Sequence, residues 1–219
     1  NTFLLYLSTK TYMSMNHNEE SFKEKRKPKG EIKFRLSLNE EQKEAKQIIL
    51  DNPVTLIKGM AGSGKTLLAC QIALDLVFKR EMEKIIITRP TVSKEEIGFL
   101  PGGLKDKLDP FIAPIYDNMY RLYNKEKIDK EFAEGRIEII PFAFMRGRNF
   151  TNSFIILDEA QNTTESQMKM FLTRMGSNAK FLITGDTTQV DLPRNQPSGL
   201  LQVMKLIKNV EGIDFIYLD

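Results

Sequence analysis

Eight consecutive residues of this chain, from Gly59 to Thr66, have the types and spacing of a loop that holds phosphate groups. They read Gly-Met-Ala-Gly-Ser-Gly-Lys-Thr and fit the pattern G-x-x-x-x-G-K-[ST], hereafter the P-loop. In such a loop the glycines allow tight turns close to an anion, and backbone N–H groups surround a β-phosphate. Lys65 can reach the β- and γ-phosphate oxygens, and the Thr66 hydroxyl can ligate Mg²⁺. The predicted nucleotide-binding residues are Gly59, Met60, Ala61, Gly62, Ser63, Gly64, Lys65 and Thr66.

The residues on either side of the P-loop indicate the strand and the helix that such a loop needs. The apolar run 54–57 is typical of a short buried strand, and residues 67–78 have the apolar face of a helix. A glycine-rich turn that binds nothing is the alternative interpretation. The order strand, loop, helix favours a phosphate site over that alternative.

A second candidate feature is a pair of carboxylates that follows an apolar run. Residues 154–157 are Phe-Ile-Ile-Leu, and Asp158 and Glu159 come next. At the carboxyl end of a buried strand, Asp158 can hold Mg²⁺ through water, facing Thr66 across the phosphates. Glu159 is then placed to polarise a water molecule for attack on the γ-phosphate. Two carboxylates that favour the start of a helix are the alternative interpretation.

A third polar segment follows the apolar run 181–183. It reads Thr-Gly-Asp-Thr-Thr-Gln and ends at Gln189. The Gln189 side chain can bond the γ-phosphate or the attacking water. The alternative is a turn from strand to loop that Asp186 caps.

The composition excludes several other kinds of chemistry. The chain has 219 residues, of which 41% are hydrophobic and 28% charged, and this suits one globular domain with or without a tail. The single cysteine, Cys70, excludes an internal disulfide and a thiolate-rich zinc site, and the single histidine, His17, argues against a Ser-His-Asp triad. The net charge of +3 permits contact with nucleic acid without requiring it. No apolar run has the length of a transmembrane helix, so we expect a cytoplasmic protein with no membrane partner.

The sequence predicts two regions. Residues 1–35 form a polar and basic lead-in that we expect to be partly disordered, and its basic run 23–30 is either solvated or an arm that contacts nucleic acid. Residues 36–219 form one α/β domain. Apolar strands that alternate with helices are typical of a parallel sheet covered on both faces. The strands are expected at 54–58, 84–88, 136–140, 154–157, 180–184 and 214–218.

The strand at 180–184 is predicted to lie between those at 54–58 and 154–157. A strand inserted there leaves room for a water molecule beside the γ-phosphate, which a carboxylate that activates water requires. Because the carboxyl ends of parallel strands meet at one edge of the sheet, the polar segments would share that edge.

Longer motifs give the sequence a specific resemblance. Besides the P-loop they are residues 88–92 (Thr-Arg-Pro-Thr-Val), 98–102 (Gly-Phe-Leu-Pro-Gly), 144–148 (Phe-Met-Arg-Gly-Arg), 155–164, 167–174 and 184–194. On these motifs the sequence resembles the PhoH family, stand-alone RecA-type ATPases whose core is similar to the first motor domain of superfamily-1 helicases. The resemblance covers roughly residues 36–219. Two motifs, the Asp-Glu-Ala-Gln-Asn-Thr-Thr run at 158–164 and the Arg-Gly-Arg, are more specific than the P-loop.

The resemblance implies a RecA-like P-loop fold, with ATP as the nucleotide and Mg²⁺ as its metal ion. It places Gln42, at the start of a helix that Asn39 is expected to cap, where related motors read the adenine edge. A glutamine near a helix start is otherwise an ordinary surface residue. The resemblance also gives Asp158 and Glu159 the metal-binding and catalytic roles already argued from their position.

The leading hypothesis is an ATPase that hydrolyses the β–γ bond, with RNA or single-stranded nucleic acid left open as a partner. One alternative is a phosphotransferase of the nucleotide-kinase type, which needs an acceptor pocket and an Arg-rich lid. The other is a nucleic-acid-binding module in which ATP is only a ligand. Glu159 favours hydrolysis because it supplies a carboxylate that activates water. Candidate contacts to nucleic-acid phosphates are Arg89, Lys94, Arg146 and Arg148.

The predicted site lacks one positive charge. Phosphoryl transfer develops charge on the γ-phosphate oxygens, and an arginine inserted there raises the rate by about a thousandfold or more. Related helicases bring this arginine from a second motor domain. We therefore expect a neighbouring subunit to supply it, in a homo-oligomeric ring of six by family resemblance. The candidates are Arg148, ranked first, then Arg146, Arg174 and Arg194, and each could instead form an ion pair within its own chain.

Overall fold

The computed structural model describes residues 2–16, 32–90, 104–193, 195–207 and 210–218 of the 219-residue chain. None of the described helices is long and apolar enough to span a membrane. The helices are α1 (Thr2–Asn16), α2 (Glu40–Asp51), α3 (Lys65–Phe78), α5 (Leu104–Leu122), α6 (Lys125–Ala133), η1 (Phe142–Phe144), η2 (Ala160–Asn162), α7 (Glu165–Leu172) and α8 (Gly199–Leu206). The strands are β1 (Val54–Gly59), β2 (Lys84–Thr88), β3 (Ile137–Ile139), β4 (Ser153–Leu157), β5 (Lys180–Gly185) and β6 (Ile213–Leu218).

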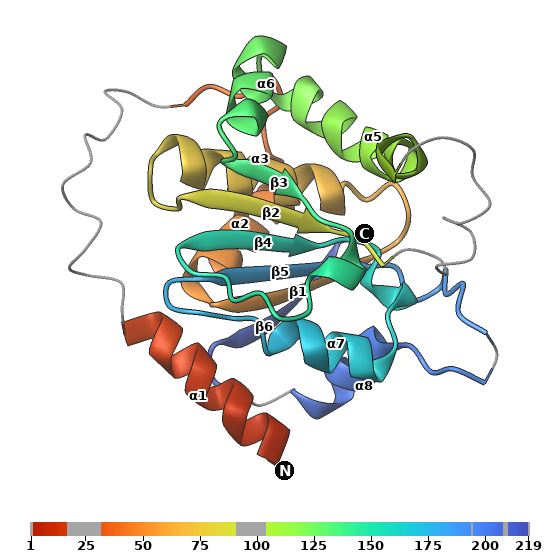
Figure 1. Cartoon of the computed structure of the whole chain (residues 1–219). Coiled ribbons are helices and arrows are strands. Elements are labelled where there is room, and N and C mark those ends of the chain that lie inside the picture. The colour runs from red at the N-terminus through yellow and green to blue at the C-terminus, as the bar shows by residue number, and fades with distance from the viewer. Residues whose placement is uncertain (1, 17–31, 91–103, 194, 208–209, 219) are drawn as a thin grey trace.

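The strands form one sheet in the order β3-β2-β4-β5-β1-β6, and every neighbouring pair is parallel (Figure 1). The predicted α/β class with a parallel sheet is therefore confirmed. So is the predicted position of β5, which lies between β1, the strand before the P-loop, and β4, the strand before Asp158. The bounds of every strand agree with the predicted ones to within one residue.

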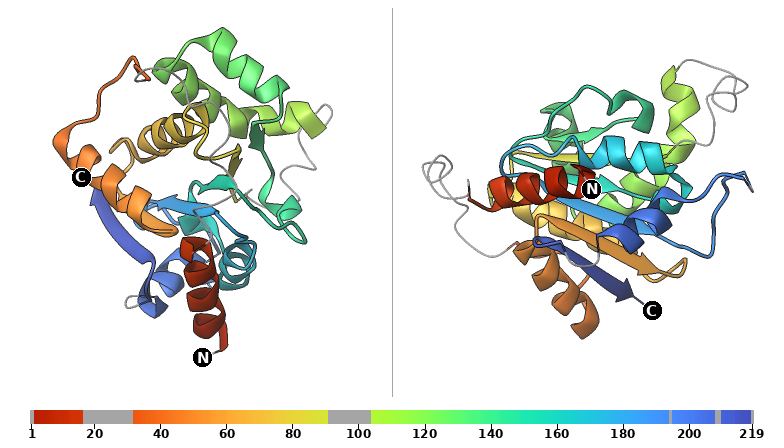
Figure 2. Two further views of the ribbon diagram at one scale, coloured as in Figure 1. Left: turned by 90° about the vertical axis from the view of Figure 1, so that its left-hand side faces the viewer. Right: turned by 90° about the horizontal axis from the view of Figure 1, so that it is seen from below.

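The four central strands, β2, β4, β5 and β1, send alternate side chains into two hydrophobic cores, one on either face of the sheet. In β1, Ile57 belongs to the core made with α2, α3 and α5, whereas Leu56 belongs to the core made with α7 and α8. Figure 2 shows these two groups of helices on opposite sides of the sheet. Burial on both faces explains why these central strands are mainly apolar.

The first part of the expected lead-in contains the helix α1, which was not predicted from the sequence. In α1 the Leu7 side chain is fully buried in the core of α7 and α8, and the Ser14 hydroxyl donates to the backbone oxygen of Ala179 at 2.9 Å. The buried side of α1 is narrow and partly polar, so no strong apolar period reveals it in the sequence. The basic run 23–30 lies outside the described residues, and the domain boundary after residue 35 stays a prediction.

Candidate functional site

The P-loop connects the end of β1 to the first turn of α3, as the sequence predicts. Gly64, which precedes α3, has a φ of 82°, in the left-handed region that glycine adopts without strain. A side chain on Gly59 would clash, because its Cβ would overlap the backbone oxygen of Leu218 in β6. Since glycine has no side chain to cap α3, the first N–H groups of that helix remain available to bind an anion.

The Lys65 side chain lies over the same loop. Its Nζ donates hydrogen bonds to the backbone oxygens of Gly59 at 2.8 Å and Met60 at 2.6 Å. The ammonium group is thus held within the P-loop, where it can neutralise the oxygens of a bound phosphate.

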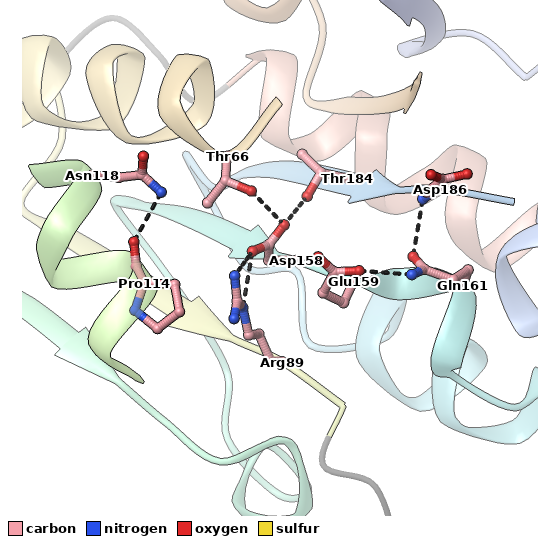
Figure 3. A network of polar contacts seen from close by, with 9 residues as sticks. All are labelled: Thr66, Arg89, Pro114, Asn118, Asp158, Glu159, Gln161, Thr184 and Asp186. Carbon is pink, nitrogen blue, oxygen red and sulfur yellow. Dashed lines mark hydrogen bonds and ion pairs between the residues drawn. The ribbon is translucent and has the colours of Figure 1, made fainter. Parts of the chain in front are cut away.

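Asp158 is the centre of a hydrogen-bond cluster at the carboxyl edge of the sheet (Figure 3). Only 1% of this residue is exposed. Its Oδ1 accepts hydrogen bonds from the hydroxyls of Thr66 at 3.0 Å and Thr184 at 2.6 Å. Its Oδ2 accepts from Arg89, at 2.9 Å from Nε and 2.5 Å from Nη2. Thr66 belongs to α3, Thr184 to β5, and Arg89 follows β2, so three elements converge on one carboxylate.

The oxygen atoms of Thr66 and Asp158 suit a magnesium ion. The Thr66 hydroxyl donates to Oδ1 of Asp158 at 3.0 Å, so two oxygen atoms of the kind that Mg²⁺ prefers lie side by side. The described residues contain no group of three or more His, Cys, Asp and Glu side chains that could hold a metal ion. The phosphates of a nucleotide and water would therefore have to supply the remaining ligands.

Glu159 has a strained backbone. Its φ of 56° and ψ of 37° lie in the left-handed region, which is uncommon for a residue with a long side chain. Such strain persists only where the surrounding structure imposes it, and it is concentrated at functional sites. Glu159 precedes η2 but its side chain does not cap this helix, which argues against the helix-start interpretation. Its carboxylate instead accepts a hydrogen bond from Nε2 of Gln161 at 2.7 Å.

Asp186, directly after β5, connects this strand to the P-loop. Its Oδ2 accepts a hydrogen bond from the backbone N–H of Ala61 at 2.9 Å. Its Oδ1 accepts from the hydroxyl and the N–H of Thr188, at 2.6 and 2.9 Å. The bonds from Thr188, followed by the one from Ala61, hold the pKa of the Asp186 carboxyl below its usual range. The residue is therefore a charged acceptor that fixes the loop to the end of β5.

The sequence model of the family described as PhoH-like protein matches residues 36–219. The chain belongs to the PhoH family. A PhoH-like protein of Synechocystis sp. is 47% identical over 179 residues, which are 81% of this chain and 55% of the relative. A PhoH-like protein of Bacillus subtilis is 47% identical over 162 residues, 74% of this chain and 51% of the relative. Protein PhoH of Escherichia coli is 38% identical over 189 residues, which cover 83% of this chain and 52% of the relative. The chain thus spans about half the length of these curated relatives.

Solved structures show a more distant likeness to this PhoH-family chain. The Pif1 helicase from Candida albicans gives a TM-score of 0.45 at 16% identity, over 84% of this chain and 39% of the helicase. The large terminase from a thermophilic bacteriophage gives a TM-score of 0.47 at 12% identity, over 84% of this chain and 46% of the terminase. Neither likeness is strong enough to bear on function.

The predicted P-loop residues and both predicted carboxylates of this PhoH-family chain meet at the carboxyl edge of the sheet. Gln42 lies beside them. Its N–H and side-chain oxygen form a capping box with Asn39 at the start of α2, and its Nε2 is 3.2 Å from where a Cβ on Gly64 would be. The structure therefore places Gln42 next to the P-loop, and its contact with adenine stays a prediction.

Gln189 and Arg148 are less closely connected to this cluster. Gln189 is exposed in the turn after β5, where its N–H donates to the backbone oxygen of Asp186 at 3.2 Å. Arg148 pairs with Glu138 of β3 at 3.1 Å and packs on the ring of Phe150. Three strands separate β3 from β1, so a catalytic role for Arg148 requires a second subunit. Of the other candidates, Arg146 is exposed, Arg174 donates to the backbone oxygen of Met170, and Arg194 lies outside the described residues.

Sequence reasoning gave no role to Thr184 or Gln161, and it treated Arg89 only as a contact to nucleic acid. The signal that could have found all three is their position at or just beyond the carboxyl ends of β5, β4 and β2, which gather at one edge. Cys70, the single cysteine, is buried in α3. Burial, with a smaller contribution from the charge of Asp158, raises the pKa of its thiol to about 12.

Proposed function

We propose that this chain is a Mg²⁺-dependent ATPase that hydrolyses the β–γ bond of ATP to give ADP and phosphate. The observation that carries the proposal is the position of β5 between β1 and β4. It sets the Asp158–Glu159 pair one strand away from the strand of the P-loop, which leaves room for a water molecule beside a γ-phosphate. For a phosphotransferase of the nucleotide-kinase type we would expect those two strands to be direct neighbours.

Each residue of the cluster has a chemical role in this proposal. Lys65 neutralises the β- and γ-phosphate oxygens, and Thr66 and Asp158 hold Mg²⁺, the second through water. The ion, when bound, offsets charge that develops on the phosphate oxygens. Glu159 accepts the proton of the attacking water, and Gln189 bonds that water or the γ-phosphate.

Two further residues complete the proposed site. Gln42, whose side chain lies beside Gly64, is proposed to contact the adenine edge. Arg89 forms an ion pair with Asp158, and this pair offsets the cost of burying the carboxylate charge. The Asp158 carboxylate is thus in place between Thr66 and Arg89 before a nucleotide arrives.

Glu159→Gln tests the proposal most directly. The substitution removes the general base but keeps the size of the side chain, so ATP binding should change little while kcat falls by about a hundredfold or more. Release of labelled phosphate measures kcat, and a fluorescent ATP analogue measures binding. Glu165→Gln is a matched control, because Glu165 is a half-exposed glutamate paired with Lys169 in α7. Near-normal turnover of Glu159→Gln would overturn the catalytic assignment.

The same assay separates hydrolysis from the alternatives. Transfer of the label from ATP to a small acceptor would support a phosphotransferase. Binding of ATP without release of phosphate would support a module for which ATP is only a ligand. Both outcomes would contradict the proposed function.

We further propose that RNA or single-stranded DNA changes the rate of hydrolysis. The exposed Phe144 ring, which lies two residues from the exposed Arg146, supports this. Aromatic rings that stack on bases, together with guanidinium groups for phosphates, are typical of surfaces that bind single strands. Phosphate release at saturating ATP, measured with and without each nucleic acid, tests the coupling, and an unchanged rate would refute it.

The proposed active form is a homo-oligomeric ring in which a neighbour supplies an arginine, with Arg148 as the first candidate. In the described part of the chain, Lys65 lies in the P-loop and Arg89 is engaged by Asp158. A further cation on the γ-phosphate is worth about a thousandfold or more in rate. Mixing Arg148→Ala subunits with Lys65→Ala subunits should restore part of the activity if sites are shared. Full activity of a demonstrably monomeric protein would refute the shared site.

A further inference from the structure

We propose that Gln161 is a positioning residue that holds the Glu159 carboxylate at a fixed place relative to the P-loop. This inference rests on the proposed function, in which Glu159 is the general base. Gln161 is 1% exposed and its side chain is bonded at both ends (Figure 3). Its Oε1 accepts from the backbone N–H of Asp186 at 3.0 Å, and its Nε2 donates to Oε2 of Glu159 at 2.7 Å.

The chemistry of the two partners fixes the orientation of the Gln161 amide. A backbone N–H can only donate and a carboxylate oxygen can only accept, so the amide oxygen must face Asp186 and the amide nitrogen must face Glu159. Turning the amide over would break both bonds in a buried place, where unmet polar groups are costly. The side chain therefore has one satisfied arrangement, and this arrangement determines where Oε2 of Glu159 lies.

The same connection continues to the P-loop. Asp186, whose N–H is bonded to Gln161, also accepts a hydrogen bond from the N–H of Ala61 through its own carboxylate at 2.9 Å. Three hydrogen bonds thus join the phosphate-binding loop to Glu159, through Asp186 and then Gln161. The distance between the P-loop and the carboxylate is set by this chain of contacts, whose members come from different elements.

The Gln161 amide packs closely against the backbone of β5. A Cβ on Gly185, the last residue of β5, would lie 2.9 Å from Oε1 of Gln161 and 2.6 Å from Cδ2 of Leu200. Glycine at this position lets the amide approach the strand closely enough to bond the next residue, Asp186. On the other side, Gln161 belongs to η2, which begins at Ala160, directly after the strained backbone of Glu159.

The bond from Gln161 leaves Glu159 able to act as a base. It occupies Oε2, and no described residue donates a hydrogen bond to Oε1 of Glu159, so that oxygen is available to a water molecule. An amide is neutral, and it orients the carboxylate without adding a positive charge beside it. An arginine or lysine in the same place would form an ion pair with the group that has to take the proton.

Three substitutions of Gln161 separate positioning from support of the fold. Gln161→Met removes both bonds at similar volume. Gln161→Glu keeps an oxygen that can accept from the N–H of Asp186 but loses the amide that donates to Glu159. Gln161→Asn keeps the amide but is too short to reach both partners. We expect kcat to fall about tenfold or more in each, with KM and the affinity for an ATP analogue within about threefold of wild type.

A double-mutant cycle with Glu159→Gln is the decisive measurement. If Gln161 acts through Glu159, adding Gln161→Met to Glu159→Gln should lower kcat by no more than about twofold, because the base is already absent. Gln167→Met is the matched control, since Gln167 also accepts a backbone N–H, that of Thr164 in the capping box of α7, without contacting Glu159. It should change the unfolding midpoint but leave kcat within about twofold.

The possible outcomes distinguish this inference from the proposed function. Wild-type kcat in Gln161→Glu, or effects that multiply in the double variant, would overturn positioning while leaving the ATPase intact. If Gln161→Met does not fold, Gln161→Glu and Gln161→Asn carry the same comparison. A wild-type protein that releases no phosphate would overturn the proposed function, and the role of Gln161 with it.

Discussion

Two buried carboxylates of this protein, Asp158 and Glu131, have very different partners. Glu131, in α6, contacts Nζ of Lys127 at 2.9 Å and Nε of Arg136 at 2.7 Å, although neither contact has the direction of a hydrogen bond. Both partners are close to it in the chain, so this cluster joins α6 to the start of β3. Asp158 instead accepts hydrogen bonds from three elements that are far apart in sequence, and two of its donors are neutral hydroxyls.

This difference separates a carboxylate that stabilises the fold, Glu131, from one that can take part in binding a metal ion, Asp158. Lys127 and Arg136 offset the charge of Glu131, so little attraction for a metal ion remains. Asp158 has one cation, and the hydroxyl beside it is a ligand that Mg²⁺ accepts. Burial of a carboxylate is therefore no sign of function by itself, and the nature of its partners decides.

The largest effect on ATP hydrolysis should come from replacing Lys65 of the P-loop, which lies at the same edge of the sheet as Asp158. Lys65→Ala should abolish ATP hydrolysis and weaken ATP binding, while the free energy of unfolding stays close to that of wild type. Lys58→Ala is the matched control, because Lys58 lies in β1 next to the P-loop but over the exposed ring of Tyr217. Phosphate release and guanidinium unfolding measure the two quantities. If Lys65→Ala unfolded the protein, the role of Lys65 would be to stabilise the fold, as is that of Glu131, and the proposed difference between the two regions would be wrong.

Glu131→Gln should instead destabilise the fold and leave ATP binding unchanged. It leaves Lys127 and Arg136 without their buried partner, so the free energy of unfolding should fall by about 3 kcal/mol, the lower end for breaking a buried ion pair. We choose the lower end because both cations reach solvent, with side-chain exposures of 43% and 33%. The affinity for ATP should not change. Urea or guanidinium unfolding and nucleotide titration of the folded variant provide the measurements.

Glu134→Gln is the control for that variant. Glu134 shares Arg136 with Glu131, but its side chain is 43% exposed. Its loss should therefore cost less than about 1 kcal/mol. If Glu131→Gln and Glu134→Gln lost the same free energy of unfolding, burial of Glu131 would add nothing to the stability that its ion pairs provide.

The sequence predicted the strands and the P-loop well because their signals are local. A buried parallel strand is apolar throughout, and the P-loop motif carries its own glycines, so β1 and the loop after it could be located by reading one segment. The order of β5 and β4 also followed, from the space that an attacking water requires. The contacts of Thr184 with Asp158 and of Gln161 with Asp186 were not predicted, because in each case the partner comes after another strand of the sheet. Helix α1 was missed because few of its side chains are buried.

The smallest expected effect concerns a third carboxylate, Glu138 in β3, which also contacts two cations. It pairs with Lys84 at 2.6 Å and Arg148 at 3.1 Å, but its side chain is 26% exposed. Glu138→Gln should therefore lower the free energy of unfolding by only about 0.5 kcal/mol, and by less in about 1 M salt, which screens exposed pairs. Chemical unfolding at low and high salt measures both values.

The pH dependence of the same variant gives a second, independent measurement. Partial burial would raise the pKa of Glu138, but hydrogen bonds from Lys84 and Arg148 outweigh it and lower the pKa below the ordinary 4.5. A lowered pKa stabilises the folded state above the unfolded value, and this contribution is lost as the pH falls through the folded value. The difference between wild type and Glu138→Gln should thus be full at about pH 7 and shrink below about pH 4.5. If Glu138→Gln lowered the free energy of unfolding at neutral pH as much as Glu131→Gln does, the number of contacting cations, rather than burial, would determine how much stability is lost with a carboxylate.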